Sequence, residues 1–401
     1  MFEELAATQP AMARRLASEL SDGTFTQASL FAGSRYTGRM TAALEASRVL
    51  SCSGKGQKGL RHCACPSCKA FRTLENTNLV IVSSRDHQSV IETAMQNFQR
   101  LRNDSSRLFL LRSVRTMLLQ YHGVLLDQGG QKNQTAYDAA AQSGELLLEL
   151  SDLPADISQS AADKLVKSLR TALRPLFIAS KRASSVSIAQ VRAIQDWSDM
   201  TSMDNAPKIA IIESIDQATE GARNSLLKML EEPQPNIWYI LLTEYPGRIM
   251  QTILSRVRKY FFPAIDEAGR ARLLRDVFFV DPSQFDTLES YFLSGGGVDS
   301  AQASRLARQF LDGVSGKTRY SLEDLAGFAS WVDETGQISY VFRLILQELE
   351  QVYLQEKISS EKAKGVSDIM GETLNQAMVY NQNHRLAIEG MYYRLMEKFN
   401  E

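Results

Sequence analysis

The sequence predicts an α/β domain built on a mainly parallel sheet, followed by helical segments. Before about residue 264, short apolar runs typical of buried strands alternate with helical patterns, and this alternation favours parallel strands joined by helices. The strand candidates are residues 28–32, 78–82, 208–213 and 238–243. Beyond them the strand signals fade, the run Gly295-Gly296-Gly297 indicates a hinge or turn, and residues 317–401 are helical in pattern.

Composition limits the class of protein. The chain has 401 residues and is 44% hydrophobic, which is enough for two or three domains with a sizeable core. It has no run of 18 or more apolar residues and no secretory-type apolar segment at its N-terminus, so we expect a cytoplasmic protein without a membrane span. A formal net charge of -1 removes the argument for direct nucleic-acid binding from a strongly basic surface, although a local basic patch is compatible with it.

A strand, a glycine-bounded loop and a helix follow one another in residues 28–50. The run Gly33-Ser-Arg-Tyr-Thr-Gly38-Arg39-Met40 has the glycine frame of a phosphate-binding loop, G-x-x-x-x-G-K-[ST]. Arg39 replaces the lysine and keeps its charge without its compact geometry, and Met40 offers Mg²⁺ no oxygen. Gly33, Gly38 and Arg39 are therefore candidate nucleotide contacts in a loop that cannot support hydrolysis. An ordinary strand–turn–helix corner is the alternative.

The strand expected at 208–213 ends in Glu213-Ser214-Ile-Asp216. Active ATPases carry an aspartate at this point, often followed by a glutamate, to orient Mg²⁺ and the attacking water. Glu213 keeps a carboxylate in a longer form, and Ser214 stands where the general base should be. Because two separate elements of one site are altered, the sequence favours a nucleotide-binding fold without ATP hydrolysis.

All four cysteines lie within residues 52–68, with the spacing Cys52-x10-Cys63-x-Cys65-x2-Cys68. Such clustering in a large intracellular chain favours a metal site over a disulfide framework. Four thiolates can close a tetrahedral structural zinc site, and no ligand set with an open catalytic position is indicated. His62 adjoins Cys63, so either residue can be the third ligand. Free buried thiols are the alternative, and they explain the clustering poorly.

Arg256 lies in Thr252-Ile-Leu-Ser-Arg256, after the strand expected at 238–243. An arginine in such a place is usually a solvated surface residue. Its functional alternative is an arginine finger, which stabilises transition-state charge on the ATP of a neighbouring subunit.

In this order, the motifs resemble those of the AAA+ clamp-loader family. The resemblance is closest to the members that generally lack a working phosphate loop. It covers residues 1–90 and 183–265 well and the rest of the chain loosely. Its carriers are residues 27–33 leading into the loop, the cysteine cluster after the following helix, Ile188-Ala-Gln-Val-Arg192, Asn224-Ser-Leu-Leu-Lys-Met-Leu-Glu-Glu-Pro233, Thr252-Ile-Leu-Ser-Arg256 with Val257 for the family's cysteine, and residues 380–390.

The resemblance implies a division into three domains. Residues 1–263 would form an AAA+ domain, a P-loop-type parallel sheet with helices, that carries a zinc module at 52–68. The link from the zinc module to the motif at Ile188–Arg192 is longer than is usual in the family. Residues from about 87 to 182 would therefore be a helical insertion. A small helical lid domain at 264–316 and a C-terminal helical collar domain at 317–401 would follow.

The resemblance also implies a function in DNA replication. The chain would be a stator-like, non-hydrolysing subunit of the bacterial DNA polymerase III clamp loader, with no independent catalytic site. It would supply Arg256 in trans to ATP held by an adjacent gamma/tau subunit. Its partners would be the gamma/tau and delta subunits, the sliding clamp and, through the complex, primed DNA. Thr243 falls at the sensor-one position, and Arg305 is a poor candidate for a sensor-two arginine.

Two other functions stay open. The first is an active gamma/tau-like ATPase in which Arg39 and Glu213 substitute for lysine and aspartate, although Met40 and Ser214 argue against it. The second is a zinc-containing interaction module outside replication that uses the segment at about 87–182 as its main surface.

Overall fold

The structure, a computed structural model, describes residues 1–55, 58–85, 87–128, 134–154, 156–182, 185–200, 206–379 and 382–400. The chain forms two compact units, Met1–Gly296 and Gly297–Glu401. The boundary between the two units falls within the predicted glycine turn, where Gly297 has a φ of +84° that glycine adopts without steric cost. The three-domain division with boundaries at 263/264 and 316/317 stays a prediction.

The first unit is built on a five-stranded sheet in the order β2-β3-β4-β1-β5, and every neighbouring pair is parallel. The strands are β1 (Ala28–Gly33), β2 (Leu79–Val82), β3 (Lys208–Ile212), β4 (Ile237–Thr243) and β5 (Arg258–Phe262). This arrangement confirms the predicted parallel α/β fold. Because the strands are parallel, the loop after β1 and the ends of β3 and β4 lie at the same edge of the sheet.

Sequence analysis missed strand β5. Tyr260 and Phe262 are buried, whereas Lys259 and Phe261 are exposed. Side chains on one face of β5 are exposed, so its sequence alternates and lacks the continuous apolar run by which the other strands were found.

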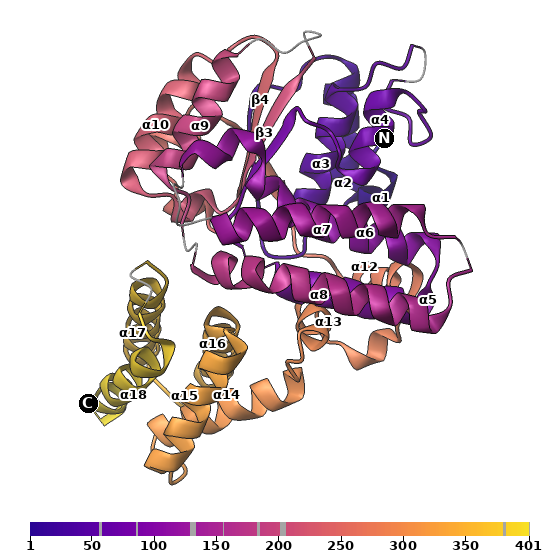
Figure 1. Cartoon of the computed structure of the whole chain (residues 1–401). Coiled ribbons are helices and arrows are strands. Elements are labelled where there is room, and N and C mark those ends of the chain that lie inside the picture. Colours follow the sequence, from indigo (N-terminus) through magenta and orange to yellow (C-terminus); the bar gives the residue numbers. More distant parts are fainter. Residues whose placement is uncertain are drawn as a thin grey trace. The chain divides into compact units, whose positions relative to one another are not determined.

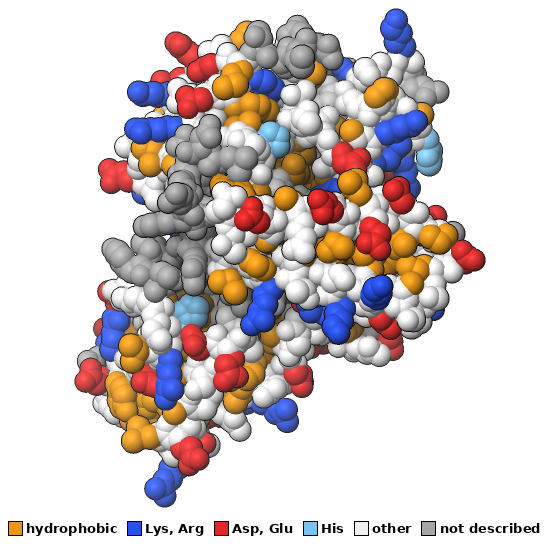
Figure 2. Space-filling view, in the orientation of Figure 1, with side chains coloured by type: hydrophobic (Ala, Val, Ile, Leu, Met, Phe, Trp, Pro, Cys, Tyr) orange, Lys and Arg blue, Asp and Glu red, His pale blue; other side chains and the backbone are white. Residues whose placement is uncertain are grey.

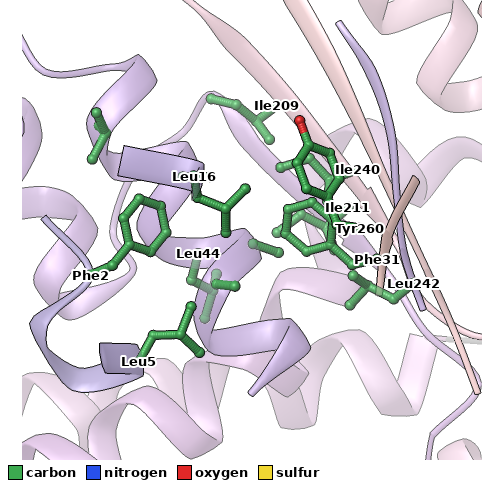
Figure 3. Close-up of a cluster of buried hydrophobic side chains, with 14 of the residues drawn as sticks. Phe2, Leu5, Leu16, Phe31, Leu44, Ile209, Ile211, Ile240, Leu242 and Tyr260 are labelled. Atoms are coloured by element: carbon green, nitrogen blue, oxygen red, sulfur yellow. The ribbon is translucent and has the colours of Figure 1, made fainter. Parts of the chain in front are cut away.

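Helices cover both faces of the sheet (Figure 1). On one side are α1 (Glu3–Ala6), α2 (Pro10–Ser21), α3 (Arg39–Leu50) and α4 (Pro66–Thr73), and on the other are α9 (Ile188–Asp199), α10 (Glu220–Glu231) and α11 (Gln251–Leu254). Successive strand residues enter opposite cores, as Phe31 and Leu30 do. Figure 3 shows the first core, in which Leu16 and Leu44 lie near Phe31.

The described part of residues 87–182 is mostly helical. It contains α5 (Gln88–Leu101), α6 (Asp104–Leu118), α7 (Gln134–Asp152) and α8 (Gln159–Arg182), joined in part by the short helices η1 (Leu119–Tyr121) and η2 (Gly123–Gln128). These helices enclose a core of their own that includes Phe98, Leu147 and Leu173. That the segment is an insertion stays a prediction.

The rest of the chain is helical, as predicted. The first unit ends with α12 (Glu267–Arg272), η6 (Leu273–Val277), η7 (Pro282–Gln284) and α13 (Leu288–Gly295). Helix α13 is tied to α5, because Asn97 donates to the Tyr291 hydroxyl at 2.7 Å.

The second unit holds α14 (Ser300–Val314), α15 (Leu322–Thr335), α16 (Ile338–Leu354), α17 (Ser360–Val379) and α18 (His384–Asn400) around a separate core. No helix among the described residues is both long and apolar enough to span a bilayer. Basic and acidic side chains are interspersed over the face shown in Figure 2.

Candidate functional site

The loop between β1 and α3 has a backbone that demands both of its glycines. A Cβ atom on Gly33 would lie 2.3 Å from the carbonyl oxygen of Phe262, because β5 passes directly beside it. Gly38 has a φ of +88°, and a Cβ atom there would lie 2.8 Å from Leu5. Steric constraints at this corner therefore account for both glycines, whether or not the loop binds phosphate.

Both arginines of the loop are paired within the chain. Nε of Arg35 lies 2.9 Å from Oε1 of Glu244, and its Nη1 lies 3.5 Å from Glu289 on α13. Arg39 is only 9% exposed, and its Nη2 lies 3.7 Å from the same Glu244 carboxylate. Burial lowers the pKa of Arg39, and the negative charge of Glu244 opposes that shift. Glu244 thus provides the anionic partner that a bound phosphate would otherwise provide.

Two further side chains of the loop make contacts within the protein that do not suit nucleotide binding. The Tyr36 ring stacks on Phe292 of α13, with ring centroids 4.8 Å apart and planes 18° apart. Met40 packs against the hydrophobic core beneath the loop. The position that would hold a Mg²⁺ ligand in an active loop therefore carries an apolar side chain that packs against the core.

The acidic group predicted at the end of β3 is also paired. Glu213 is buried, accepts a hydrogen bond from the Ser83 hydroxyl at 2.8 Å and forms an ion pair with Arg85 at 3.2 Å. Ser214 adopts a left-handed conformation with a φ of +58°. The structure places Glu213 near enough to Arg39 for its charge to raise the arginine's pKa, so the two candidate elements share one site.

Thr243, at the end of β4, donates a hydrogen bond of 2.7 Å to Oδ1 of Asp216. Burial raises the pKa of Asp216, and the Thr243 hydroxyl opposes the shift. Thr243 is fully buried, and its hydrogen bond to Asp216 holds the segment after β3 against β4.

Sequence analysis missed the residues that pair with the site, namely Arg35, Arg85 and Glu244. Glu244 directly follows a predicted strand, so its place at the carboxyl edge of the sheet was accessible from the sequence. Its partners were not, because they depend on β1 lying next to β4 in the strand order.

The four cysteines converge on one point. Their sulfur atoms all lie within 4.8 Å of one another, and Sγ of Cys52 is 3.6 Å from that of Cys63 and 3.9 Å from that of Cys65. Sulfurs about 2.3 Å from a tetrahedral zinc ion would lie about 3.8 Å apart, so this cluster can hold a metal ion of that kind. Cys63 is buried within the cluster and His62 is exposed outside it.

Neighbouring N–H groups are directed at the sulfurs. The backbone N–H of Cys68 donates to Sγ of Cys65 at 3.4 Å, and that of Gly59 donates to Sγ of Cys52 at 3.3 Å. Burial alone would raise the pKa of Cys65, but hydrogen bonds from Cys68 and Ser53 lower it to about 6. Arg48 of α3 approaches Sγ of Cys68 at 3.1 Å. These contacts favour the thiolate, the form in which cysteine binds metal, at Cys65 and Cys52, whereas burial raises the pKa of Cys68 in spite of Arg48.

Arg256 lies between α11 and β5 and is one-third exposed. Its Nη1 donates to the Thr252 carbonyl at 2.7 Å, and its Nη2 lies 2.5 Å from Oε1 of Glu231 at the end of α10. Arg305 is exposed on α14, in the second unit.

Comparison with family models and with known proteins identifies the family of this chain. The family described as "DNA polymerase III, delta subunit" matches residues 8–127 and 121–266, which is more than half of the chain. DNA polymerase III subunit delta' of Bacillus subtilis is 40% identical over 91 residues, covering 22% of this chain and 28% of that protein. DNA polymerase III subunit tau of the same bacterium is 28% identical over 219 residues, covering 53% of this chain and 35% of that protein.

The matched segments therefore span only about a third of the length of these relatives, or less. Among solved structures, a gamma subunit-related protein of DNA polymerase III from Thermotoga maritima is similar with a TM-score of 0.30 and 19% identity. That match covers 54% of this chain and 81% of the other.

Proposed function

Because this chain belongs to the DNA polymerase III delta subunit family, we propose that it is a delta-prime-type, non-hydrolysing subunit of a clamp loader. In that complex, gamma/tau subunits would bind and hydrolyse ATP, and the assembly would load the sliding clamp onto primed DNA. The delta' relative of B. subtilis, at 40% identity, supports this choice within the family.

The observation that carries the non-hydrolysing part of the proposal is the ion pairing around the loop. Glu244 already pairs with both Arg35 and Arg39, and Arg85 already pairs with Glu213. A triphosphate would have to displace Glu244, and Mg²⁺ would find Met40 where it needs an oxygen. The residues present therefore do not fit ATP hydrolysis by this chain, so no step of the reaction is assigned to its own loop.

Arg256 is the residue that we assign to the chemistry of a neighbouring site. Its guanidinium is partly exposed and is presented from the short segment between α11 and β5. There it would stabilise the charge that develops on the γ-phosphate of an adjacent subunit's ATP.

We assign a structural zinc ion to Cys52, Cys63, Cys65 and Cys68. The ion would cross-link residues 52–68 and hold them against α3, on which Arg48 approaches Cys68. Four thiolates leave no open coordination position, so the ion has no place in a reaction.

The remaining assignments follow from the same proposal. The delta subunit would be a further partner, and the second unit, Gly297–Glu401, would contribute to a helical collar with the other subunits. The cytoplasmic location expected from the sequence stays a prediction.

The decisive experiment is reconstitution of the clamp loader with Arg256→Ala. We expect assembly to persist while ATP hydrolysis falls roughly 10³-fold at the one site that Arg256 serves. The loss for the whole complex is smaller, because other sites stay active. Clamp loading at the parental rate by the mutant complex would rule out the finger role.

The match to subunit tau favours the alternative that this chain is an active gamma/tau-like ATPase. An ATP titration of the isolated chain distinguishes that alternative from the proposed function. We expect no turnover, and micromolar binding with measurable hydrolysis would contradict the stator role. Failure to co-purify with gamma/tau and delta subunits would instead favour an interaction module outside replication.

A further inference from the structure

The guanidinium of Arg256 is held on one side and free on the other. Its Nη1 donates to the Thr252 carbonyl and lies 3.4 Å from the Ser255 hydroxyl, and its Nη2 pairs with Glu231. Within the described part of the chain, Nε–H and the second N–H of Nη2 have no partner. These two groups remain available as donors to a phosphate, the kind of acceptor that arginine binds well.

Glu231 occupies a place that is unfavourable for a carboxylate on its own. It is the last residue of α10, where the helix dipole is negative and acidic side chains are disfavoured. Leu226 and Leu230 of the same helix are buried in the core beneath the sheet, so the position of Glu231 relative to the sheet is fixed. Its ion pair with Arg256 supplies the positive charge that this helix end favours.

We propose that Glu231 is a positioning residue for Arg256, an inference that rests on the proposed function of Arg256 itself. The arginine side chain has many rotamers in solvent, and each must be given up when the guanidinium engages a phosphate. Glu231 and the Thr252 carbonyl restrict those rotamers before the neighbouring subunit arrives. Arg256 then loses less conformational entropy when its guanidinium binds the phosphate. This smaller loss lowers the free energy of the transition state at the neighbouring site.

The step that Arg256 serves is hydrolysis of ATP on that subunit. Water attacks the γ-phosphorus, the bond to the oxygen that bridges the β- and γ-phosphates breaks, and ADP and phosphate leave while water gives up a proton. Glu231 touches none of these atoms and acts only through the arginine.

Exposure indicates that Glu231 positions Arg256 without sequestering it. The Arg256 side chain is 33% exposed and that of Glu231 is 48% exposed, and an ion pair this accessible to water is weak. A triphosphate carries more negative charge than one carboxylate, and it can use the free N–H groups without breaking the pair.

The test uses the reconstituted clamp loader with Glu231→Gln, which keeps the size of the side chain and removes its charge. The measured quantity is the part of the ATPase rate that Arg256→Ala abolishes. We expect Glu231→Gln to lower that part about two- to fivefold, through kcat and without a change in the KM for ATP, as loss of a weak exposed ion pair would do. Glu232→Gln is the matched control, because Glu232 is the next residue and is also exposed, and it should leave the rate unchanged.

A double-mutant cycle distinguishes positioning from a general structural role. In an Arg256→Ala background, Glu231→Gln should have no further effect, because the residue it positions is absent. An equal loss in both backgrounds, an unchanged rate or a raised rate in the parent would each overturn the positioning role. If Arg256→Ala itself has no effect, the proposed finger function fails, and the inference fails with it. If only Glu231→Gln has none, the inference alone fails.

Discussion

Glu244 pairs with two arginines of the loop after β1, Arg35 and Arg39. Arg39 is almost fully buried, and a buried cation without a partner is strongly destabilising. Once lysine and the Mg²⁺-binding hydroxyl are absent from such a loop, an internal carboxylate is the simplest way to keep its remaining positive charge buried. The pairing thus gives a physical reason why this loop can persist in the fold without a nucleotide.

His87, at the start of α5, is another buried ionisable residue near this edge of the sheet. It is 2% exposed, Arg85 approaches its Nδ1 at 3.5 Å, and the Gln120 amide lies 2.8 Å from its Nε2. Burial, and then the positive charge of Arg85, place the pKa of His87 well below 6.5. The folded protein therefore holds a neutral imidazole at this position.

This environment predicts a pH dependence of stability. As pH falls below 6.5, the unfolded chain takes up a proton at His87 that the folded chain does not, so the free energy of unfolding decreases. We expect His87→Gln to make the melting temperature less dependent on pH between 7 and 5. The measurement is thermal unfolding across that range.

His62→Gln, which changes an exposed imidazole, is the matched control for this experiment. Its pH dependence should follow that of the parent. A curve for His87→Gln that also parallels the parent would show that His87 does not remain neutral in the fold.

At the scale of elements, residues 52–68 form a short segment whose four cysteine sulfurs converge on one point. The described residues between α3 and α4 contain no helix or strand, so few backbone hydrogen bonds hold them. The N–H groups of Gly59 and Cys68 are directed at sulfurs instead. We therefore expect a bound metal ion to contribute most of the stability of this segment.

This gives a prediction for metal content and stability. The purified chain should carry one zinc ion, and Cys65→Ser or Cys68→Ser should lose it. Loss of an ion that is present at a thousandfold its Kd removes about 4 kcal/mol of stability. Elemental analysis and thermal unfolding with and without a chelator measure both effects.

His62→Asn separates the two ligand sets considered from the sequence. Since His62 is exposed and outside the sulfur cluster, this variant should keep its zinc. Loss of the ion in His62→Asn, with retention in Cys63→Ser, would contradict the four-cysteine site.

The whole molecule consists of two units with separate hydrophobic cores. Phe31 lies in a core of the first unit and Phe328 in the core of the second. Proteins with more than one such unit commonly depart from two-state unfolding.

Calorimetry should therefore resolve two unfolding transitions. Phe31→Ala and Phe328→Ala should each destabilise one unit by about 3–5 kcal/mol, because both side chains are fully buried. Each variant should shift one transition and leave the other in place. A single transition that both variants shift equally would show that the units unfold together.

The sequence by itself determined the elements that depend on local pattern. The helix expected after the glycine-bounded loop in residues 28–50 is present as α3 (Arg39–Leu50), because its apolar spacing is a local signal. Four of the five strands were found as apolar runs, and the cysteine cluster followed from spacing alone. Motif order was enough to indicate the family.

Only the tertiary structure decided which charged residues meet. The pairs Arg39–Glu244, Arg85–Glu213 and Arg256–Glu231 join residues far apart in the chain, and each depends on the order of the strands or the packing of a helix. Strand β5 and the exclusion of His62 from the sulfur cluster were decided in the same way. Electrostatic pairing acts through distance in space, and periodicity in a sequence carries no information about that distance.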